Sequence, residues 1–293
     1  MSGDQGQGPV VQSALLRNEL VRLRKDRVMT QEQVAAALEW SPSKLIRVEG
    51  GRSSITKVDL DALLTLYGVA SQEQRERLIG FNRAARDRGW WDTYRSADFD
   101  DDAYLTYVGY EAGASAIRAF QGSAIPGLLQ TREYAEVLTE NSINATRVRP
   151  VVDLRMQRQS ELARRSTPPR QYHIMDEAVI RRHVGIKKDP AIMPNQLRHI
   201  AERAEREELL TVRVIPFKAG AHPGIAGPFT LLEFDGGLAD LLYLDAGRRA
   251  ISMVVGDDPR IADYAGDFAA LIEEALPNDR SIEFIRNVAD EML

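Results

Sequence analysis

The sequence predicts a multi-domain chain, with an all-α domain of five helices followed by an α+β domain with a mostly antiparallel sheet. Its 293 residues are enough for one large domain or two modest ones. Apolar residues recur at helical spacing up to about residue 88, whereas later segments mix helical periods with short strand-like runs. Between them lies the aromatic and acidic stretch "GWWDTYRSADFDDDAY", where the composition and the apolar periodicity change. These observations place a domain junction near Gly89.

The predicted domain boundaries follow from this change in composition and periodicity. We expect a flexible tail over residues 1–12, a first domain over 13–88, a linker over 89–102 and a second domain over 103–293. The N-terminus has no basic region followed by an apolar run, so we expect no signal peptide. No apolar stretch approaches the roughly 18 residues that cross a bilayer. We therefore expect a cytoplasmic protein with no membrane partner.

Helix signals run through the first domain in order. Apolar residues at helical spacing predict a helix over 13–27. Thr30 stands three residues before Gln33, a capping-box pattern that starts a second helix at Gln31. Ser41 and Pro42 are typical of a third helix start, and Gly50-Gly51 of its end. Two further helices are expected over 57–67 and 71–88.

The second domain mixes helices and strands. Helices are expected over 102–113, 131–141, 147–164, 190–208, 257–276 and 279–292. Strands are expected over 116–121, 171–175, 211–217, 229–234, 241–245 and 250–255. The last three strands are closely spaced, with a Gly-Gly turn at 236–237, and this predicts an antiparallel meander flanked by helices.

Charge separates the two halves of the chain. The whole chain is acidic, with 38 Lys and Arg against 43 Asp and Glu. Residues 13–58, however, carry nine basic and five acidic residues, a net charge of +4. Such asymmetry is typical of a nucleic-acid-binding module joined to another domain, although chance clustering of charge remains an alternative.

The second and third predicted helices have the features of a helix-turn-helix. A small residue, Ala35, falls where the two helices cross, and apolar residues hold the turn. The exposed face of the third helix would enter the major groove, where the Arg47 guanidinium suits guanine O6 and N7. Gln31 and Arg52 suit phosphates. The predicted DNA contacts are Gln31, Ser41, Ser43, Lys44, Arg47 and Arg52.

The stretch "LRKDRVMTQEQVAAALEWSPSKLIRVEGGRS" resembles the Cro/repressor-like (XRE) family of helix-turn-helix regulators. The resemblance covers about residues 13–68 and implies an ion pair between Arg24 and Glu49. The sequence departs from that family at two positions. Glu39 stands where the family usually has Gly, which costs about 1 kcal/mol if the positive φ is kept. Pro42 replaces a base-reading side chain of some relatives, which shifts the predicted readout onto Ser43, Lys44 and Arg47.

A second resemblance covers most of residues 90–285. It rests on "YEAGASAIRAFQGSAIPGLLQTREYAEVL", "LRMQRQSEL", "MDEAVIRRHVG", "VIPFKAGAHPGIAGPFTLLEF" and "LLYLD". These segments look like the C-terminal domain of a large actinobacterial group of antitoxin-like helix-turn-helix regulators. The resemblance implies a regulator, often associated with a small acidic partner protein, and it implies no established enzymatic activity.

Two segments of this domain allow both a structural and a functional interpretation. In "IPGLLQT", Pro126-Gly127 suits a turn and Thr131 a helix cap, or else Gln130 and Arg132 line a recognition site. The loop "AGAHPGIAGPF" suits an anion-binding backbone or a tight connection. The candidate residues for binding a ligand or partner are Gln130, Arg132 and His222.

Signatures of catalysis are missing from the sequence. There is no cysteine, no His-Glu-x-x-His, no Gly-x-Ser-x-Gly, no phosphate-binding loop and no dinucleotide fingerprint. Asp176-Glu177 suits an acid/base pair less well than a helix cap, because adjacent residues of a strand point to opposite faces. We therefore expect no enzyme, no catalytic residue, no cofactor and no metal site.

The leading hypothesis is a sequence-specific transcriptional regulator. One domain would bind double-stranded DNA, and the other would receive a signal from a small-molecule effector or a small partner protein and support a homodimer. The alternative is an antitoxin-like factor that sequesters a small partner and binds DNA for autoregulation. A third possibility is an enzyme with a DNA-binding appendage.

Overall fold

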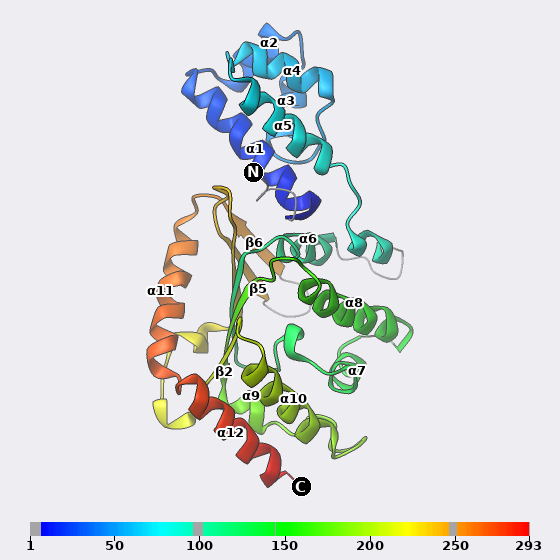
Figure 1. Ribbon diagram of the computed structural model, residues 1–293, viewed down its shortest axis with the longest axis vertical. Coiled ribbons are helices and arrows are strands. Elements are labelled where there is room, and N and C mark those ends of the chain that lie inside the picture. Colours follow the sequence, from blue (N-terminus) through cyan, green and yellow to red (C-terminus); the bar gives the residue numbers. More distant parts are fainter. Residues whose placement is uncertain (1–6, 96–101, 144, 246–250, 293) are drawn as a thin grey trace. The chain divides into compact units, whose positions relative to one another are not determined.

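The computed structural model describes residues 7–95, 102–143, 145–245 and 251–292. The chain divides into two units (Figure 1), one of residues 1–90 with 235–238 and one of residues 91–234 with 239–293. Parts of the expected tail (residues 1–6) and of the expected linker (residues 96–101) lie outside the described residues.

The first unit is helical throughout its described part, as the sequence predicts. Its five helices are α1 (Gly8–Asp26), α2 (Gln31–Ala37), α3 (Pro42–Glu49), α4 (Lys57–Leu66) and α5 (Gln72–Ala84). Residues 8–12, which we expected in the tail, form the start of α1. Pro9 lies in the first turn, where its missing N–H costs nothing, and Val11 is fully buried.

Side-chain caps set the starts of three of these helices. Thr30 and Gln33 form the predicted capping box: the Thr30 hydroxyl accepts from the Gln33 N–H, and the Gln33 amide accepts from the Thr30 N–H. Thr56 and Ser71 cap α4 and α5 in the same way, by accepting from the N–H three residues on. Such a cap contributes about 1 kcal/mol to helix stability.

The helices of the first unit pack through a small apolar core. Its members are fully or almost fully buried, and they include Leu20, Val34, Ala35, Leu45, Val48, Leu60, Leu63 and Leu64. Helix α3 shows how this fixes orientation, because Leu45 and Val48 are its only buried residues. These two side chains hold one face of α3 inward and leave the opposite face to solvent.

The second unit is built on a six-stranded mixed sheet with the strand order β3-β2-β1-β4-β5-β6. The strands are β1 (Ala116–Gln121), β2 (Arg170–Asp176), β3 (Leu210–Ile215), β4 (Phe229–Glu233), β5 (Leu241–Asp245) and β6 (Ile251–Val255). The β1–β2 and β2–β3 pairs are parallel, and the other three are antiparallel. The predicted late meander is therefore confirmed as β4-β5-β6, and antiparallel pairs are in the majority.

Helices connect and cover these strands. They are α6 (Asp102–Glu111), α7 (Arg132–Glu140), α8 (Ala145–Ala163), α9 (Glu177–Arg181), α10 (Ile192–Arg206), α11 (Pro259–Glu274) and α12 (Asn278–Glu291). The sequence predicted all of them except α9, whose five residues are too few to show a helical period. A short 3₁₀ helix, Trp90–Tyr94, occupies part of the expected linker, and Trp91 is buried.

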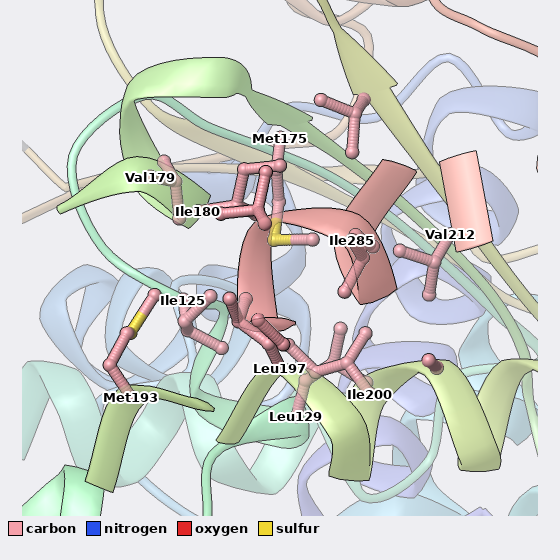
Figure 2. Packing of buried hydrophobic residues seen from close by; sticks show 14 of the residues in the cluster. Ile125, Leu129, Met175, Val179, Ile180, Met193, Leu197, Ile200, Val212 and Ile285 are labelled. Carbon is pink, nitrogen blue, oxygen red and sulfur yellow. The ribbon is translucent and has the colours of Figure 1, made fainter. Parts of the chain in front are cut away.

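Each face of the sheet packs against its own set of helices. On one face, Met175 and Val212 contact a cluster that includes Leu197, Ile200 and Ile285 of α10 and α12 (Figure 2). The other face packs on α11 through a cluster of Ile174, Leu231, Leu242, Phe268 and Leu271. Within the described residues, no helix combines the length and the apolar composition needed to span a bilayer.

Candidate nucleic-acid interface and ligand cavity

The turn between α2 and α3 has a positive φ at Glu39, the position where the sequence departs from the family's usual glycine. Glu39 has a φ of 57°, in the left-handed region that favours glycine. The Trp40 N–H donates to the Ala35 carbonyl, which closes the end of α2. Glu39 thus takes the conformation that reverses the chain here, at a cost of about 1 kcal/mol relative to Gly. Val28, before α2, is a second non-glycine residue with positive φ, and no sequence pattern predicted it.

The Arg24–Glu49 ion pair implied by the family resemblance is present. Arg24 Nε donates to Glu49 Oε1 (2.8 Å), and Arg24 Nη2 donates to Glu49 Oε2 (2.9 Å). Both side chains are largely withdrawn from water, and the pKa of Arg24 is raised chiefly by its hydrogen bond to Glu49. This two-point contact joins α1 to the end of α3 and so fixes how α3 is held.

Gln31 extends the same cluster. Its side-chain Nε2 donates to Glu49 Oε2 (2.7 Å), and the residue is half-buried. We expected Gln31 to hold a phosphate. The structure places its amide on Glu49, where it supports α3 from the start of α2.

The exposed face of α3 carries four residues at helical spacing: Ser43, Ile46, Arg47 and Gly50. Arg47 is exposed. Lys44, in contrast, is engaged at the side of the helix. Its ammonium donates to Asp59 Oδ1 (2.9 Å) and lies 3.9 Å from the centre of the Trp40 ring. Of the two basic side chains predicted to read bases, Arg47 is therefore the one on the outward face.

The remaining predicted DNA contacts lie at the two ends of α3. Ser41 is exposed and precedes the helix, but its hydroxyl does not cap it and instead lies 3.2 Å from the Ser43 hydroxyl. Arg52 is exposed just beyond α3, and its N–H donates to the Arg47 carbonyl. Ser41, Ser43, Arg47 and Arg52 thus lie on or beside one exposed helix, with Gln31 and Lys44 at its edges.

Ile46 belongs to this face and was missed by the sequence analysis. Its side chain is 44% exposed, whereas Leu45 and Val48 of the same helix are buried. The signal in the sequence was its position: Leu45 and Val48 take the buried stripe, so Ile46 must point outward beside Arg47. An apolar side chain on such a face suits the methyl group of thymine.

The three candidates in the second unit lie in different surroundings. Arg132 is paired with Asp153 (2.8 Å) and half-exposed. His222 has a buried ring whose Nε2 lies 3.2 Å from Asp176 Oδ2. Gln130 is buried, donates to the Ile125 carbonyl and accepts from Arg155. The structure does not bring the three together, and Gln130 alone lines the cavity described below.

The two ambiguous segments have clear local roles. Leu128 and Leu129 are buried and the Thr131 hydroxyl caps α7, as the structural interpretation of "IPGLLQT" expects. In the glycine-rich loop, Gly224 lies against the ring of Phe120, where a Cβ would come within 2.2 Å of Phe120 Cζ. That close approach favours the tight-connection interpretation. Asp176 caps α9 by accepting from the Ala178 N–H.

A cavity of about 700 Å³ lies within the second unit. Part of its lining is a single row across the sheet, in which His173 of β2, Ala119 of β1, Thr230 of β4 and Tyr243 of β5 are direct neighbours in register. All four side chains share one face, because they occupy matched positions of paired strands. Ala119 contributes only a methyl group, which leaves room above the sheet.

Two helices and a loop line most of the rest of the cavity. Helix α8 contributes Arg147, Val151, Arg155 and Arg158, spaced so that they share one helical face, and α6 contributes Tyr104, Tyr107 and Glu111 in the same manner. The segment 123–130 contributes Ser123, Ala124, Ile125, Pro126, Gly127, Leu128 and Gln130, and the remaining lining residues are Ile117, Gln121, Leu138, Ile143, Pro228 and Phe229. The cavity is therefore bounded by six separate stretches of sequence: 104–111, 117–130, 138–158, 173, 228–230 and 243.

A buried ion pair joins the two helices at this wall. Arg158 Nε and Nη2 donate to the two carboxylate oxygens of Glu111 (2.8 and 2.7 Å), and Arg158 Nη1 donates to the Tyr104 hydroxyl. The Tyr107 hydroxyl donates to Glu111 as well (2.7 Å), and burial followed by the charge of Glu111 raises the pKa of Tyr107. Tyr107 is therefore a neutral donor, and Arg158 and Glu111 neutralise each other.

His173 contributes no positive charge to the cavity at neutral pH. Burial, aided by the charge of Arg203, lowers the pKa of His173 to about 3. Its Nε2 lies 3.2 Å from Gln171 Oε1, whereas its Nδ1 is buried with no partner among the described residues. Among the residues that the structure describes, no group of three or more His, Asp or Glu could hold a metal ion.

Comparison with known protein families matched two segments. A model described as "Domain of unknown function (DUF5753)" matches residues 104–287, more than half of the chain. A model described as "Helix-turn-helix domain" matches residues 15–78, which contain the α2–α3 face. No curated protein and no solved structure matched the chain.

Proposed function

Because the chain belongs to the DUF5753 family and carries a helix-turn-helix domain ahead of that region, we propose that it is a sequence-specific transcriptional regulator. The observation that carries this proposal is the exposed face of α3. It presents Ser43, Ile46 and Arg47 outward on a helix that is held from behind by a buried ion pair.

Each outward side chain has a role in this proposal. Arg47 donates to guanine O6 and N7, Ile46 contacts a thymine methyl group, and Ser43 accepts or donates at either base. Ser41 and Arg52 contact phosphates on the two sides of the groove. Lys44 and Gln31 act mainly by holding Asp59 and Glu49, and they reach DNA only by exchanging those partners.

We further propose that the regulator works as a homodimer. One recognition helix reaches too few base pairs for selective binding, and two-fold proteins read two half-sites about one helical turn apart. The resemblance to XRE regulators of the actinobacterial antitoxin-like group, and a cytoplasmic location, fit this role.

Selection from a random DNA library tests the proposal directly. The full chain is expected to enrich one sequence that contains two related half-sites, and to bind it at least roughly 10³-fold more tightly than unrelated DNA. Failure to enrich any sequence, with the protein folded, would contradict sequence-specific binding. Enrichment of a single unpaired half-site would contradict the dimer alone.

In this proposal the second unit receives a small-molecule signal. The cavity favours this over the antitoxin-like alternative, in which the unit would sequester a small acidic partner protein. A cavity of about 700 Å³ lies in the usual size range of small-molecule sites, whereas capture of a protein calls for an exposed apolar face.

A further inference from the structure

The charges that line the cavity do not balance. Three arginines line it (Arg147, Arg155 and Arg158), and Glu111 is the only acidic residue among its lining residues. Glu111 neutralises the charge of Arg158 and accepts two hydrogen bonds from it. His173 is neutral at physiological pH because burial lowers its pKa to about 3. Two guanidinium groups therefore remain without an acidic counterpart in the cavity wall.

Arg155 is the better defined of the two. Its Nη1 donates to the side-chain oxygens of Gln130 (3.0 Å) and Thr139 (3.3 Å), both of which are neutral acceptors. Burial lowers the pKa of Arg155, Tyr104 acts against this lowering through its hydroxyl, and the neighbouring charge of Arg158 adds to it. Arg155 is half-buried, its hydrogen-bond partners are neutral, and no carboxylate among the lining residues is left to compensate its charge.

Unused hydrogen-bonding atoms surround the same space. Arg147 Nε is buried with no partner among the described residues, and so is Nδ1 of His173, a side chain that is 1% exposed. Buried polar atoms in native proteins are nearly always paired. Two unpaired atoms at one cavity, beside an uncompensated guanidinium, indicate that a polar molecule completes the site.

We propose that this cavity binds a small organic anion, with Arg155 and Arg147 as its charge partners. A carboxylate or a phosphate suits a guanidinium, because two parallel N–H groups match two anionic oxygens. Tyr104, Tyr107 and Tyr243 line the cavity too and suit the less polar body of the ligand. Gln130 holds Arg155 in place through its side-chain oxygen.

The role of this anion as a signal rests on the proposed regulatory function, but its binding does not. Helix α8 supplies the charge partners Arg147 and Arg155, and through Arg158 it is joined to α6. An anion held by Arg147 and Arg155 that also contacts Tyr104 or Tyr107 of α6 would add a second link between two helices that already share one ion pair. Binding is tested without DNA, so a failed DNA selection and a failed ligand titration are separate outcomes.

Titration of the full chain with two probe anions, benzoate and phenyl phosphate, tests the proposal at constant ionic strength. Benzamide, which has the same ring without the charge, is the neutral control probe. We expect saturable one-to-one binding of at least one anion and weaker binding of benzamide. Comparison of the two anions distinguishes a carboxylate ligand from a phosphate ligand.

Two variants on the same helix locate the binding. Arg155→Gln is expected to weaken binding of the preferred anion roughly tenfold or more, because a charge-assisted contact is lost. Arg149→Gln is the matched control: Arg149 also lies on α8, but its side chain is 91% exposed and it does not line the cavity. Circular dichroism checks that each variant is folded, and Arg147→Gln takes the place of Arg155→Gln if that variant fails to fold.

Three results would overturn the proposal. They are no saturable binding of either anion to the folded chain, equal weakening by Arg155→Gln and Arg149→Gln, or binding of benzamide as tight as that of the anions. The second would mean that only surface charge attracts the probe, and the third that the arginines make no contact with it.

Discussion

Glu39 shows how one residue sets the path of the chain at the candidate DNA interface. Its positive φ of 57° occurs where α2 ends and α3 is about to begin, so the direction of α3 depends on a conformation that L-residues adopt at a cost. The sequence marked this position only through a departure from a family pattern. The structure supplies the reason for the family's preference for glycine.

Replacement of Glu39 by Gly is expected to stabilise the first unit by about 1 kcal/mol, because glycine adopts positive φ without strain. Ala36→Gly is the matched control, since Ala36 is exposed within α2 and the change there should destabilise by a similar amount. Urea unfolding followed by tryptophan fluorescence measures both. Destabilisation by Glu39→Gly would mean that the Glu39 side chain makes a contribution larger than the strain.

His173 gives the free energy of unfolding a pH dependence that can be assigned to one residue. In the unfolded chain its pKa returns to about 6.5, whereas in the folded chain it is held at about 3, so acidification favours the unfolded state. Between pH 7 and pH 5 this group alone costs about 2 kcal/mol of stability. His173→Gln should remove that part of the pH dependence, measured by urea unfolding at both values. An unchanged difference between pH 7 and pH 5 in the variant would show that folding does not lower the pKa of His173.

At the scale of elements, the joint between α1 and α3 holds the proposed recognition helix. The carboxylate of Glu49, at the end of α3, is almost fully buried. It accepts hydrogen bonds from Arg24 of α1 and from Gln31 of α2. The Arg24–Glu49 pair was implied by resemblance, but the third member was not. Gln31 was expected to face DNA because its position at a helix start suits a phosphate, and only the packed structure shows the competing acceptor.

Arg24→Met tests this joint. Loss of the guanidinium leaves Glu49 with one hydrogen-bond donor in a largely dry site, so we expect a loss of about 3 kcal/mol in the free energy of unfolding. The double variant Arg24→Met, Glu49→Leu should recover much of this loss, because no buried charge is left unpaired. Equal destabilisation by the single and double variants would show that packing of the Arg24 stem matters more than its charge.

The sequence predicted local structure better than it predicted long-range assembly. Helix starts at Gln31 and Pro42 and all six strands followed from caps, turns and apolar periods, which are local signals. The cavity did not, because its cross-strand row joins Ala119, His173 and Tyr243 through a strand order that no local pattern fixes. Gln130 was found only as a candidate, because no local pattern shows that its side-chain oxygen accepts from Arg155 of α8.

For the whole molecule, charge divides as the two proposed roles require. Residues 1–90 are net positive by three charges, whereas the rest of the chain is net negative by eight. Non-specific attraction to DNA should therefore come from the first unit alone and weaken steeply with salt. In the second unit, the positive charge of Arg147 and Arg155 lines a cavity, which suits the small anion that we propose.

The most direct test of the central claim, that α3 reads bases, compares Arg47→Ala with Arg52→Ala on two duplexes at one salt concentration. One duplex carries the selected sequence and the other a scrambled one. We predict that Arg47→Ala weakens binding to the selected duplex by roughly 10- to 100-fold and hardly changes binding to the scrambled one. Arg52→Ala should weaken both to a similar extent. Equal losses on both duplexes for Arg47→Ala would contradict base readout by α3.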